Sequence, residues 1–375
     1  MLLDDFNANR SLYYVDPSTD KITSKDWSTV LSKAPECTPK NPAPGMQDLV
    51  IDADLGSSFV DMNADCRPDI LLQSVGENHQ RVQEFYLYSN EGFCLVSKQN
   101  MAATWTMPSF FDMNNRGTND MVFAEQNSAN AGIKVHVLRN KYTTDLGKDL
   151  CKANEGNLDF PYPGYTETKS SDNTFIYNLY VNGPQNKFLY EEADASYLPP
   201  IVQLADVDLD GYADMALVLA TGRKDDASRS YTHVFMGQKC SGEGRAIVFP
   251  EGATENQAKD CRYFNETAFT HHTENVDQST YTATNTLRTS FFDFGELGAF
   301  SMLSQTYNPT TKDTEIGTYF NFMNKNNYFL KSMARTHGRA NGNTYIGLNY
   351  LAVRTEMDGK NNPVSCKPNF FLTQK

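Results

Sequence analysis

Aspartates recur in this chain at the spacing of a calcium-binding loop. The most complete loop has carboxylates at its first, third, fifth and ninth positions: Asp206, Asp208, Asp210 and Asp214. A hard cation such as Ca²⁺ prefers oxygen ligands at such positions. The backbone carbonyl of Tyr212 adds the seventh position, and Gly211 permits the sharp turn at the sixth. The flanks read as strands, so the pattern predicts a strand–loop–strand Ca²⁺ site.

A second loop keeps the same side-chain positions, with Asp61, Asn63, Asp65 and Asp69. Arg67 stands at the seventh position, where the ligand is a backbone carbonyl. Cys66 replaces the glycine of the sixth position. We expect Ca²⁺ here as well, although Cys66 makes this loop a weaker candidate.

Three further loops are less complete. Arg116 occupies a ligand position in the loop that starts at Asp112, and Tyr13 replaces the last carboxylate of the loop at Asp5. The loop at Asp293 has too few oxygens, and we expect it to be structural only. For every loop the alternative is a turn that caps a strand through side-chain-to-backbone hydrogen bonds.

The elements that position these loops repeat along the chain. Each loop joins two apolar runs, and the first aspartates stand at 5, 61, 112, 206 and 293, so the intervals are 56, 51, 94 and 87 residues. The first two intervals fit a four-stranded propeller blade of ~40–50 residues. The last two are longer, so either a blade has lost its loop or each interval carries a long insertion. The polar stretch 141–197 favours an insertion in the third interval.

Alternating segments downstream of the loops predict strands. Residues 84–96 and 319–330 each read as strand, tight turn, strand, with Asn or Gly at the turn. Residues 134–140 lack an equally clear returning strand. Helical periodicity is scarce, and the best short helix is predicted at 24–32. We expect Trp105 to lie in the core between blades and Trp27 to pack at the surface. The predicted fold class is all-β.

The repeat resembles the FG-GAP repeat of integrin α-subunit propellers, an apolar run followed by Asp-x-Asp-x-Asp-Gly-x-x-Asp and a second apolar run. The order of the segments SSFVDMNADCRPDILL, EFYLYSNEGFCLV, LADVDLDGYADMALVLA and SFFDFGELGAFSML is similar to the later repeats of the T-cell immunomodulatory protein family. The resemblance covers most of residues 1–335. It implies a seven-bladed β-propeller in the whole protein, followed by a β-rich segment and one transmembrane helix.

By this resemblance the chain corresponds to repeats three to seven. The expected blades lie near 1–55, 56–106, 107–200, 201–287 and 288–335, and residues 336–375 begin a C-terminal β-sandwich-like region. The acidic N-terminus does not resemble a signal peptide, which fits the expectation that this chain is part of a longer protein.

Seven cysteines are present, and none forms a CxxC pair, so zinc ribbons and thioredoxin-type chemistry are disfavoured. The resemblance suggests that Cys240 pairs with Cys261; the alternative is two buried thiols. Two sequons, at Asn9 and Asn265, are weak indications of a secretory route, and we take Asn265 as the candidate glycosylation site.

Composition excludes other classes of function. The chain has 375 residues and a formal net charge of −13, which disfavours nucleic acid as a partner. No run of 18 or more apolar residues is present, so no bilayer-spanning helix is predicted. The chain lacks GxSxG, HExxH, GxxxxGK[ST] and GxGxxG motifs. The pair His271 and His272 lies in a polar stretch that we interpret as a solvated loop. We therefore do not expect an enzyme.

The sequence favours a calcium-binding propeller that serves as an extracellular or lumenal platform for protein recognition or adhesion. A membrane anchor would lie in a segment absent from this chain. The alternative is a structural scaffold subunit of a large membrane-associated assembly, with the inserts 141–199, 222–231 and 240–290 gripping neighbours. A third possibility is an accessory propeller of an enzyme whose catalytic domain lies elsewhere.

Overall fold

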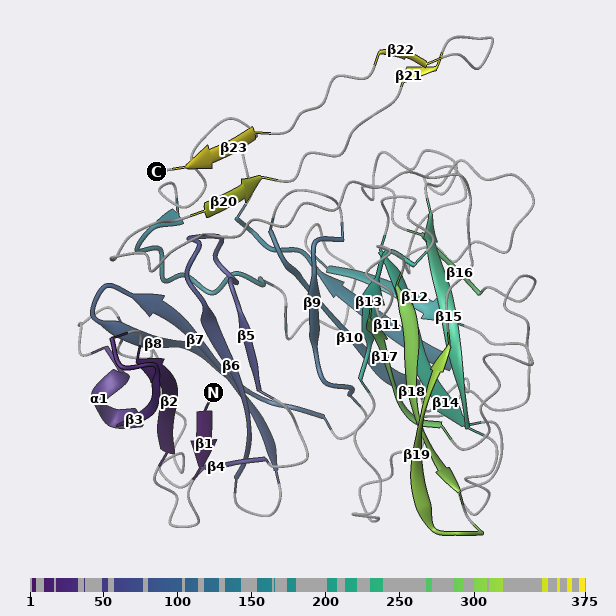
Figure 1. Ribbon diagram of the computed structural model, residues 1–375, viewed down its shortest axis with the longest axis horizontal. Coiled ribbons are helices and arrows are strands. Elements are labelled where there is room, and N and C mark those ends of the chain that lie inside the picture. Colours follow the sequence, from purple (N-terminus) through teal and green to yellow (C-terminus); the bar gives the residue numbers. More distant parts are fainter. Residues whose placement is uncertain are drawn as a thin grey trace. The chain divides into compact units, whose positions relative to one another are not determined.

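The computed structural model is built from small antiparallel sheets, and α1 is the one helix named among the residues it describes (Figure 1). The described residues are 2–4, 10–16, 18–32, 37, 49–52, 57–76, 80–102, 105–113, 118–127, 132–142, 154–163, 165, 174–179, 201–207, 213–220, 230–238, 268–271, 286–292, 300–308, 310–319, 346–349, 356–357, 363–365 and 371–374. The predicted all-β class is confirmed. Two compact units are present: residues 1–208 with 212–323, and residues 324–375 with 209–211.

The first sheet contains β1 (Leu2–Asp4), β2 (Arg10–Asp16) and β3 (Lys21–Asp26), in that order. The helix α1 (Trp27–Val30) follows directly, and the Asp26 side chain caps it by accepting a hydrogen bond from the Ser28 amide at 2.8 Å. The helix predicted at 24–32 is therefore correctly located but shorter, because β3 continues to Asp26.

Trp27 is buried, with 6% of its surface exposed. Its ring packs edge-on against Tyr86 at 5.1 Å and stacks on Phe93 at 5.9 Å. The expectation that Trp27 lies at the surface is wrong, because the strands that receive it come roughly sixty residues later in the chain, beyond the reach of a local pattern.

The second sheet contains β4 (Val50–Ile51), β5 (Ser58–Val60), β6 (Asp69–Val75), β7 (Arg81–Ser89) and β8 (Gly92–Asn100). The order is β4-β6-β7-β8, and β5 also pairs with β6. The hairpin predicted within 84–96 is confirmed. Gly92 closes its turn at φ +129°, and a Cβ there would lie 2.4 Å from the Val30 carbonyl oxygen, so this position requires glycine.

The third and fourth sheets share one up-and-down order. The third runs β12-β11-β10-β9 and the fourth β13-β14-β15-β16. Their strands are β9 (Ser109–Phe111), β10 (Asp120–Asn127), β11 (Gly132–Leu138), β12 (Thr174–Leu179), β13 (Gln203–Ala205), β14 (Asp214–Ala220), β15 (Ser230–Gln238) and β16 (Ala268–His271). The strand that returns after β11 is thus β12, which lies inside the polar stretch 141–197 predicted as an insertion.

The last sheet of the first unit contains β17 (Thr286–Phe292), β18 (Ser301–Asn308) and β19 (Asp313–Tyr319). In the second unit β20 (Ile346–Asn349) pairs with β23 (Phe371–Gln374), and β21 (Glu356–Met357) pairs with β22 (Pro363–Ser365). None of the sheets closes on itself within the part of the chain that the structure describes.

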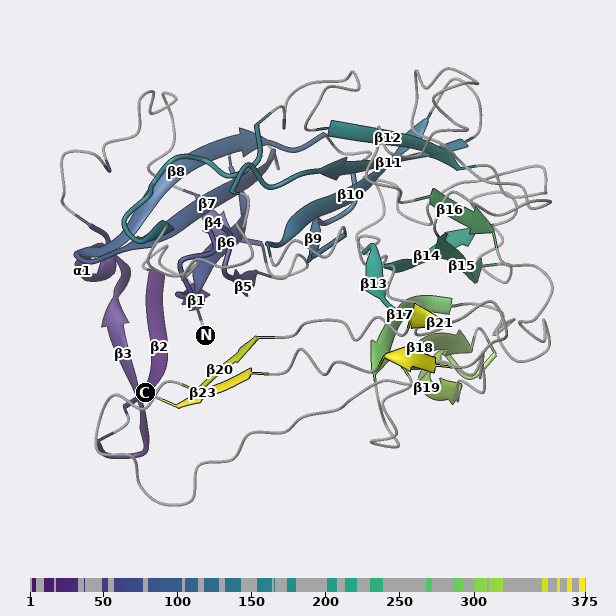
Figure 2. The same cartoon turned by 90° about the horizontal axis from the view of Figure 1, so that it is seen from above.

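Within the first unit, consecutive sheets pack face to face in chain order (Figures 1 and 2). Side chains alternate across β6, so Ile70 and Leu72 face Trp27 while Leu71 faces the third sheet, where Met121 contributes. Similar contacts join the third sheet to the fourth and the fourth to β17. Sheets buried on both faces follow from strands that are apolar on both faces.

Trp105 lies in the cluster between the second and third sheets, as predicted. Its ring centroid lies 4.7 Å from that of Phe123, and its indole N–H donates to Glu125 at 2.8 Å.

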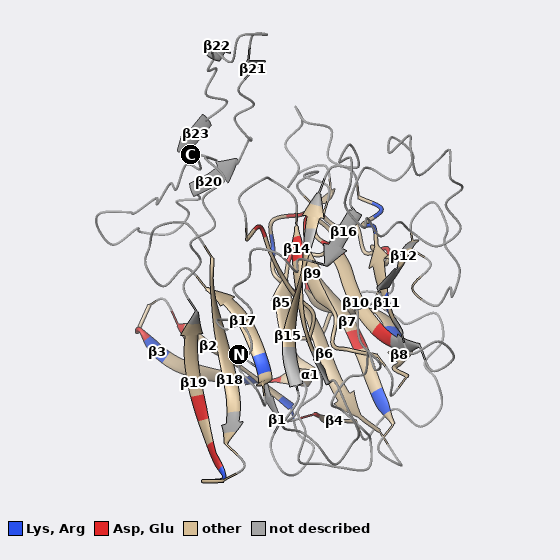
Figure 3. Cartoon of the chain, turned by 90° about the vertical axis from the view of Figure 1, so that its right-hand side faces the viewer, with Lys and Arg blue, Asp and Glu red and all other residues tan. Residues whose placement is uncertain are grey.

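Most of the strand length carries neutral residues (Figure 3). Among the described residues, no helix combines the length and the apolar character that crossing a bilayer requires.

Candidate metal centre

Asp69, the ninth residue of the loop that starts at Asp61, is buried and accepts hydrogen bonds from two parts of the second sheet. Asp69 opens β6, and its Oδ2 accepts hydrogen bonds from the amide of Met62 at 2.7 Å and, more weakly, of Asn63 at 3.4 Å. Its Oδ1 accepts from the amide of Tyr88 in β7 at 2.8 Å. The Asp69 carboxylate thereby joins the start of the loop to β6 and β7.

The same arrangement recurs in the next two sheets. Asp214 accepts from the Val207 amide at 2.6 Å and from the Gly237 amide at 2.7 Å. Asp120 accepts from the Asn140 amide at 2.9 Å, and a backbone hydrogen bond from Met113 also acts on it. Each aspartate thus bonds to the second position of its loop and to the end of its third strand. These bonds are of the strand-capping kind that the sequence left as the alternative to calcium.

The Asp61 loop is folded by its own side chains. Asp61 accepts from the amides of Asp65 at 3.1 Å and Cys66 at 2.9 Å, while Asn63 Oδ1 accepts from the Asp65 amide at 3.2 Å. Cys66 has φ +66°, a left-handed conformation that favours glycine. This conformation explains why a glycine is expected at the sixth position.

One carboxylate oxygen in this loop is buried without a partner. Asp65 Oδ1 accepts from the Arg67 amide at 2.9 Å, whereas Asp65 Oδ2 has no hydrogen-bond partner, although the residue is only 4% exposed. A buried acceptor left without a donor is destabilising. It is therefore the atom of the loop to which a cation would add the most.

Burial raises the pKa of all three carboxyl groups, and repulsion from neighbouring carboxylates adds to it. Burial is the main cause at Asp69, where the pKa rises to about 7, with repulsion from Asp65 and Asp61 adding to it. Burial, then repulsion from Asp65, raises the pKa of Asp61. Burial also raises the pKa of Asp65, and the hydrogen bond from the Arg67 amide, the Asn63 side chain and the Arg67 charge offset only part of that effect.

Two neighbouring segments hold the backbone of the loop. From the third sheet, the side-chain amides of Asn119 and Asn140 donate to the carbonyls of Asp61, at 3.1 Å, and Met62. These asparagines were missed by the sequence analysis, because nothing in their local pattern indicates a partner in another sheet.

The second segment is 154–157, part of the predicted insertion. Asn154 donates to the Ala64 carbonyl at 3.4 Å, and Asn63 donates to the Asn157 carbonyl at 3.1 Å. Arg67 pairs with Glu155 at 2.8 Å. The composition of 141–197 indicated an insertion but not the surface against which it packs.

A comparison with known proteins found a relative that is similar to much of this chain. A curated protein described as a T-cell immunomodulatory protein homolog, from Plasmodium yoelii yoelii, is 23% identical over 310 residues. The chain resembles T-cell immunomodulatory proteins. The match covers 74% of this chain but only 39% of that relative's length, and no protein-family model matches the chain.

Several predicted site residues lie outside the described part of the chain. These are Asp208, Asp210, Tyr212, Cys240, Cys261 and Asn265. Asp206 and Asp214 are described, half-buried and buried respectively. No group of three or more His, Cys, Asp or Glu side chains able to hold a metal ion is found in the described ranges.

A disulfide whose partners the sequence left open joins Cys37 to Cys94 across 57 residues, with a Cα–Cα distance of 5.0 Å. It lies beside the core of the second sheet, near Val96 and Leu158. Cys66 is also disulfide-bonded.

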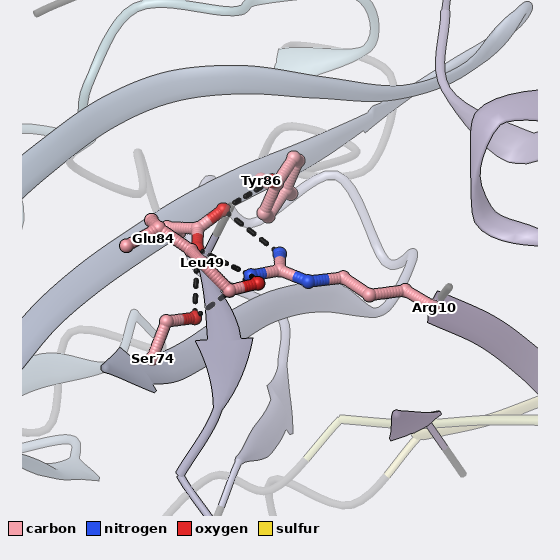
Figure 4. A network of polar contacts seen from close by, with 5 residues as sticks. All are labelled: Arg10, Leu49, Ser74, Glu84 and Tyr86. Atoms are coloured by element: carbon pink, nitrogen blue, oxygen red, sulfur yellow. Dashed lines mark hydrogen bonds and ion pairs between the residues drawn. The ribbon is translucent and has the colours of Figure 1, made fainter. Parts of the chain in front are cut away.

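At the other end of the β6–β7 pair, a buried carboxylate has a quite different environment (Figure 4). Glu84 pairs with Arg10 at 3.0 Å and accepts from the hydroxyls of Ser74 at 2.7 Å and Tyr86 at 2.5 Å. Arg10 also donates to the Leu49 carbonyl at 2.8 Å. Burial alone would raise the pKa of Glu84, but the hydrogen bond and charge of Arg10, with Tyr86 and Ser74, hold it below its ordinary value.

Proposed function

We propose that the chain is a segment of an FG-GAP-type β-propeller equivalent to repeats three to seven. The blades correspond to 1–55, 56–106, 107–200, 201–287 and 288–335, followed by the start of a C-terminal β-domain in 336–375. Consecutive small antiparallel sheets that pack face to face support this architecture. The same three-way hydrogen bonding at Asp69, Asp120 and Asp214 supports it as well.

The Asp61 loop is proposed to bind Ca²⁺ through Asp61, Asn63, Asp65, the Arg67 carbonyl and Asp69. The observation that carries this proposal is the buried, unpartnered Oδ2 of Asp65 among carboxyl groups whose pKa values are raised. Amide hydrogen bonds do not use up these carboxylates, because each has about four lone-pair sites.

Binding would require these side chains to turn toward a common point. In the structure they accept from loop amides instead, and repulsion between Asp61 and Asp65 keeps their charges unfavourable. A divalent ion removes that repulsion, since its own charge dominates such a site. When bound, the ion would supply charge neutralisation and stiffen the hairpin between β5 and β6.

A second Ca²⁺ is proposed in the Asp206 loop, with Asp206, Asp208, Asp210, the Tyr212 carbonyl and Asp214 as ligands. The sequence pattern carries this assignment. The equivalent bonding of Asp214 and Asp69 supports it, because the two loops share one framework.

The proposed role of the whole protein is a non-enzymatic extracellular or lumenal platform for protein recognition, anchored in a membrane by a segment outside this chain. The Cys37–Cys94 disulfide supports an oxidising compartment. The net charge of −13 supports proteins rather than nucleic acids as partners. The name of the relative, a T-cell immunomodulatory protein homolog, supports an extracellular or membrane protein.

The rival role, a scaffold subunit whose inserts grip neighbouring chains, has less support. Part of the 141–199 insert packs inward, since Tyr162 and Tyr165 are buried in the core between the second and third sheets. An accessory propeller of an enzyme differs from the platform only in what the rest of the gene product carries.

Calorimetric titration with Ca²⁺ tests the metal proposal, after removal of bound ions by a chelator. Two sites are expected in the wild-type chain, and one site in each of the variants Asp65→Asn and Asp210→Asn. Asp313→Asn, which alters an exposed acid on β19, is the control and should keep both sites. Unchanged heat in Asp65→Asn would refute the Asp61 site.

Affinity purification of the tagged protein from its native membrane separates the two roles. A monomeric protein that captures partners only after mild crosslinking supports a recognition platform. A stable, stoichiometric complex that survives purification supports the scaffold instead.

A further inference from the structure

The second residue of the Asp61 loop is part of the core between two sheets. Met62 is fully buried, and its side chain belongs to the hydrophobic cluster that joins the second sheet to the third. Met121 of β10 and Leu138 of β11 lie in the same cluster. Met62 stands between Asp61 and Asn63, two of the residues proposed to bind Ca²⁺. The loop therefore carries candidate ligands and interface contacts on adjacent residues.

The third sheet also holds the main chain of this loop. Asn119 donates from its side chain to the Asp61 carbonyl at 3.1 Å, and Asn140 donates to the carbonyl of Met62. The Asn140 side chain also donates to the Asn119 carbonyl at 3.0 Å and accepts from the Tyr142 amide at 2.9 Å. Because Asn140 is buried, its hydrogen bonds are not weakened by competition with water. The two asparagines thus tie the first two residues of the loop to the start of β10 and the end of β11.

The 154–157 segment orients a proposed ligand. The Asn63 side chain donates through its nitrogen to the Asn157 carbonyl at 3.1 Å, while its oxygen accepts from the Asp65 amide within the loop at 3.2 Å. Leu158, the next residue of the segment, packs against the cluster between the two sheets. The direction of the Asn63 oxygen therefore depends on a segment that belongs to the same interface.

The side chains that hold the main chain of the loop are neutral. Asn119 and Asn140 donate to carbonyl oxygens through uncharged amides, whereas at the other end of the strand pair Arg10 balances the charge of Glu84. An amide donor can fix a carbonyl without adding a positive charge. The two asparagines therefore hold the loop in place and do not compete with an ion for its carboxylates.

The next loop along the chain has a buried residue at the same position. Met113, the second residue of the loop at Asp112, is buried in the cluster between the third and fourth sheets. That loop carries Arg116 at a ligand position. A buried residue at the second position is thus a feature of both loops, and each joins its own sheet to the following one. The Asp61 loop combines this feature with oxygen-bearing side chains at all four ligand positions.

We propose that the Asp61 loop is a calcium-dependent latch between the second and third sheets, with Asn119 and Asn140 as positioning residues for the ion site. This proposal rests on the proposed calcium function of the loop. When the ligand side chains turn toward a common ion, they fix the main chain that the two asparagines hold and the Met62 side chain that fills the interface. Coupling between two sites is reciprocal, so the interface strengthens ion binding by the same factor as the ion strengthens the interface.

The Ca²⁺ affinity of the Asp61 loop measures this coupling. In the full chain with Asp210→Asn, which leaves only this loop to bind, Asn140→Ala should weaken Ca²⁺ binding by at least about fivefold in a calorimetric titration. In the chain with Asp65→Asn, which leaves only the other loop, the same substitution should not change the affinity. Asn100→Ala, which alters an exposed residue at the opposite end of the second sheet, is the control and should change neither affinity.

Hydrogen exchange gives a second measurement that does not depend on the folding of Asn140→Ala. In the chain with Asp210→Asn, Ca²⁺ should slow amide exchange in β10 and β11 of the third sheet as well as in the loop itself. Exchange in β18 and β19 should not change, because these strands lie in another sheet. Asn119→Ala, which alters a half-buried residue, should reduce the protection of β10 and β11.

The outcomes distinguish the latch from the calcium site. Ca²⁺ binding that Asn140→Ala leaves unchanged, or that does not slow exchange in β10 and β11, overturns the latch and keeps the calcium site. Weaker binding in both backgrounds indicates a general loss of stability and also overturns the latch. Absence of binding in the chain with Asp210→Asn alone overturns the calcium site of the Asp61 loop, and the latch with it.

Discussion

The two ends of the β6–β7 strand pair bury carboxylates in opposite ways. At one end Glu84 lies against Arg10, Ser74 and Tyr86, and its pKa is lowered. At the other end Asp61, Asp65 and Asp69 accept mainly from backbone amides, and their pKa values are raised. Both groups lie within one sheet, so burial alone does not decide the direction of the pKa shift. The direction depends on whether a positively charged side chain such as Arg10 lies beside the carboxylate.

The comparison shows at which end the buried charge is balanced within the protein. The Arg10–Glu84 pair is neutral as a unit, and its polar atoms are used by Ser74, Tyr86 and the Leu49 carbonyl. The Asp61 loop carries negative charge and leaves Asp65 Oδ2 without a donor. The first end needs nothing further for stability, whereas the second gains from a cation.

The largest effect on stability is expected from removing Arg10, the cation that balances Glu84. Arg10→Met leaves the Glu84 carboxylate buried and uncompensated, which should lower the free energy of unfolding by about 3–5 kcal/mol. Urea denaturation would measure the loss. The double variant Arg10→Met with Glu84→Leu should recover most of it, because an apolar pair of similar volume often replaces a buried ion pair without loss. Equal instability of both variants would show that Arg10 acts through other contacts.

The next effect is a pair of opposite slopes in stability against pH. The pKa of Glu84 lies below its ordinary value of 4.5, so its stabilisation is present above that pH and is lost as pH falls through the folded-state value. Burial, followed by repulsion from Asp112, raises the pKa of Asp120 from 3.8 to about 7, so its contribution is present below 3.8 and is lost as pH rises through about 7.

Variants separate the two slopes. Glu84→Gln should flatten the acid limb of the stability curve, and Asp120→Asn should remove a decline of roughly 2–4 kcal/mol between the ordinary and raised pKa values. Denaturant titrations across the acid and neutral range would measure both. If both variants change the same limb, the contrast between the two carboxylates is wrong.

Calcium should act on one end only. At a hundredfold excess over its dissociation constant, Ca²⁺ bound to a native site adds about 2.7 kcal/mol to stability. Asp65→Asn should lose the part of this gain that comes from the Asp61 loop, yet be no less stable than the wild type in chelator, because it removes a repelled charge. Glu84→Gln is the matched control and should respond to Ca²⁺ as the wild type does. Thermal melts with and without Ca²⁺ would measure these shifts.

The smallest effect is expected at the edge of the loop. Arg67 and Glu155 form an ion pair of 2.8 Å whose side chains are 31% and 48% exposed. Glu155→Gln should therefore change the free energy of unfolding by less than about 1 kcal/mol. A larger loss in a urea titration would show that this ion pair contributes more to stability than an exposed pair usually does.

The sequence predicted the features that repeat. Asp69 and Asp214 were identified because the loop spacing recurs, and the unusual sixth position was recognised because Cys66 stands where the pattern requires glycine. The strand pairs around Gly92 were predicted by alternation and a turn residue. These are local rules, and each acts within a few residues.

Long-range partners could not be predicted in this way. The Cys37–Cys94 bond spans 57 residues and the Arg10–Glu84 pair spans 74, and neither has a local signal. Trp27 was placed at the surface because it lies in a short connecting helix, whereas its burial depends on Tyr86 and Phe93. What the sequence leaves open is decided by which sheets come to lie against one another.

The position of the insert within the third sheet also sets an order in time. Residues 154–165 of the insert precede β12, which lies later in the same insert, so they leave the ribosome before the strand that completes the third sheet. Tyr162 and Tyr165 pack against residues of the second and third sheets that have already been made. During synthesis the insert can therefore join these two sheets before β12 arrives, so that the last strand of the third sheet is added to an interface that is already closed.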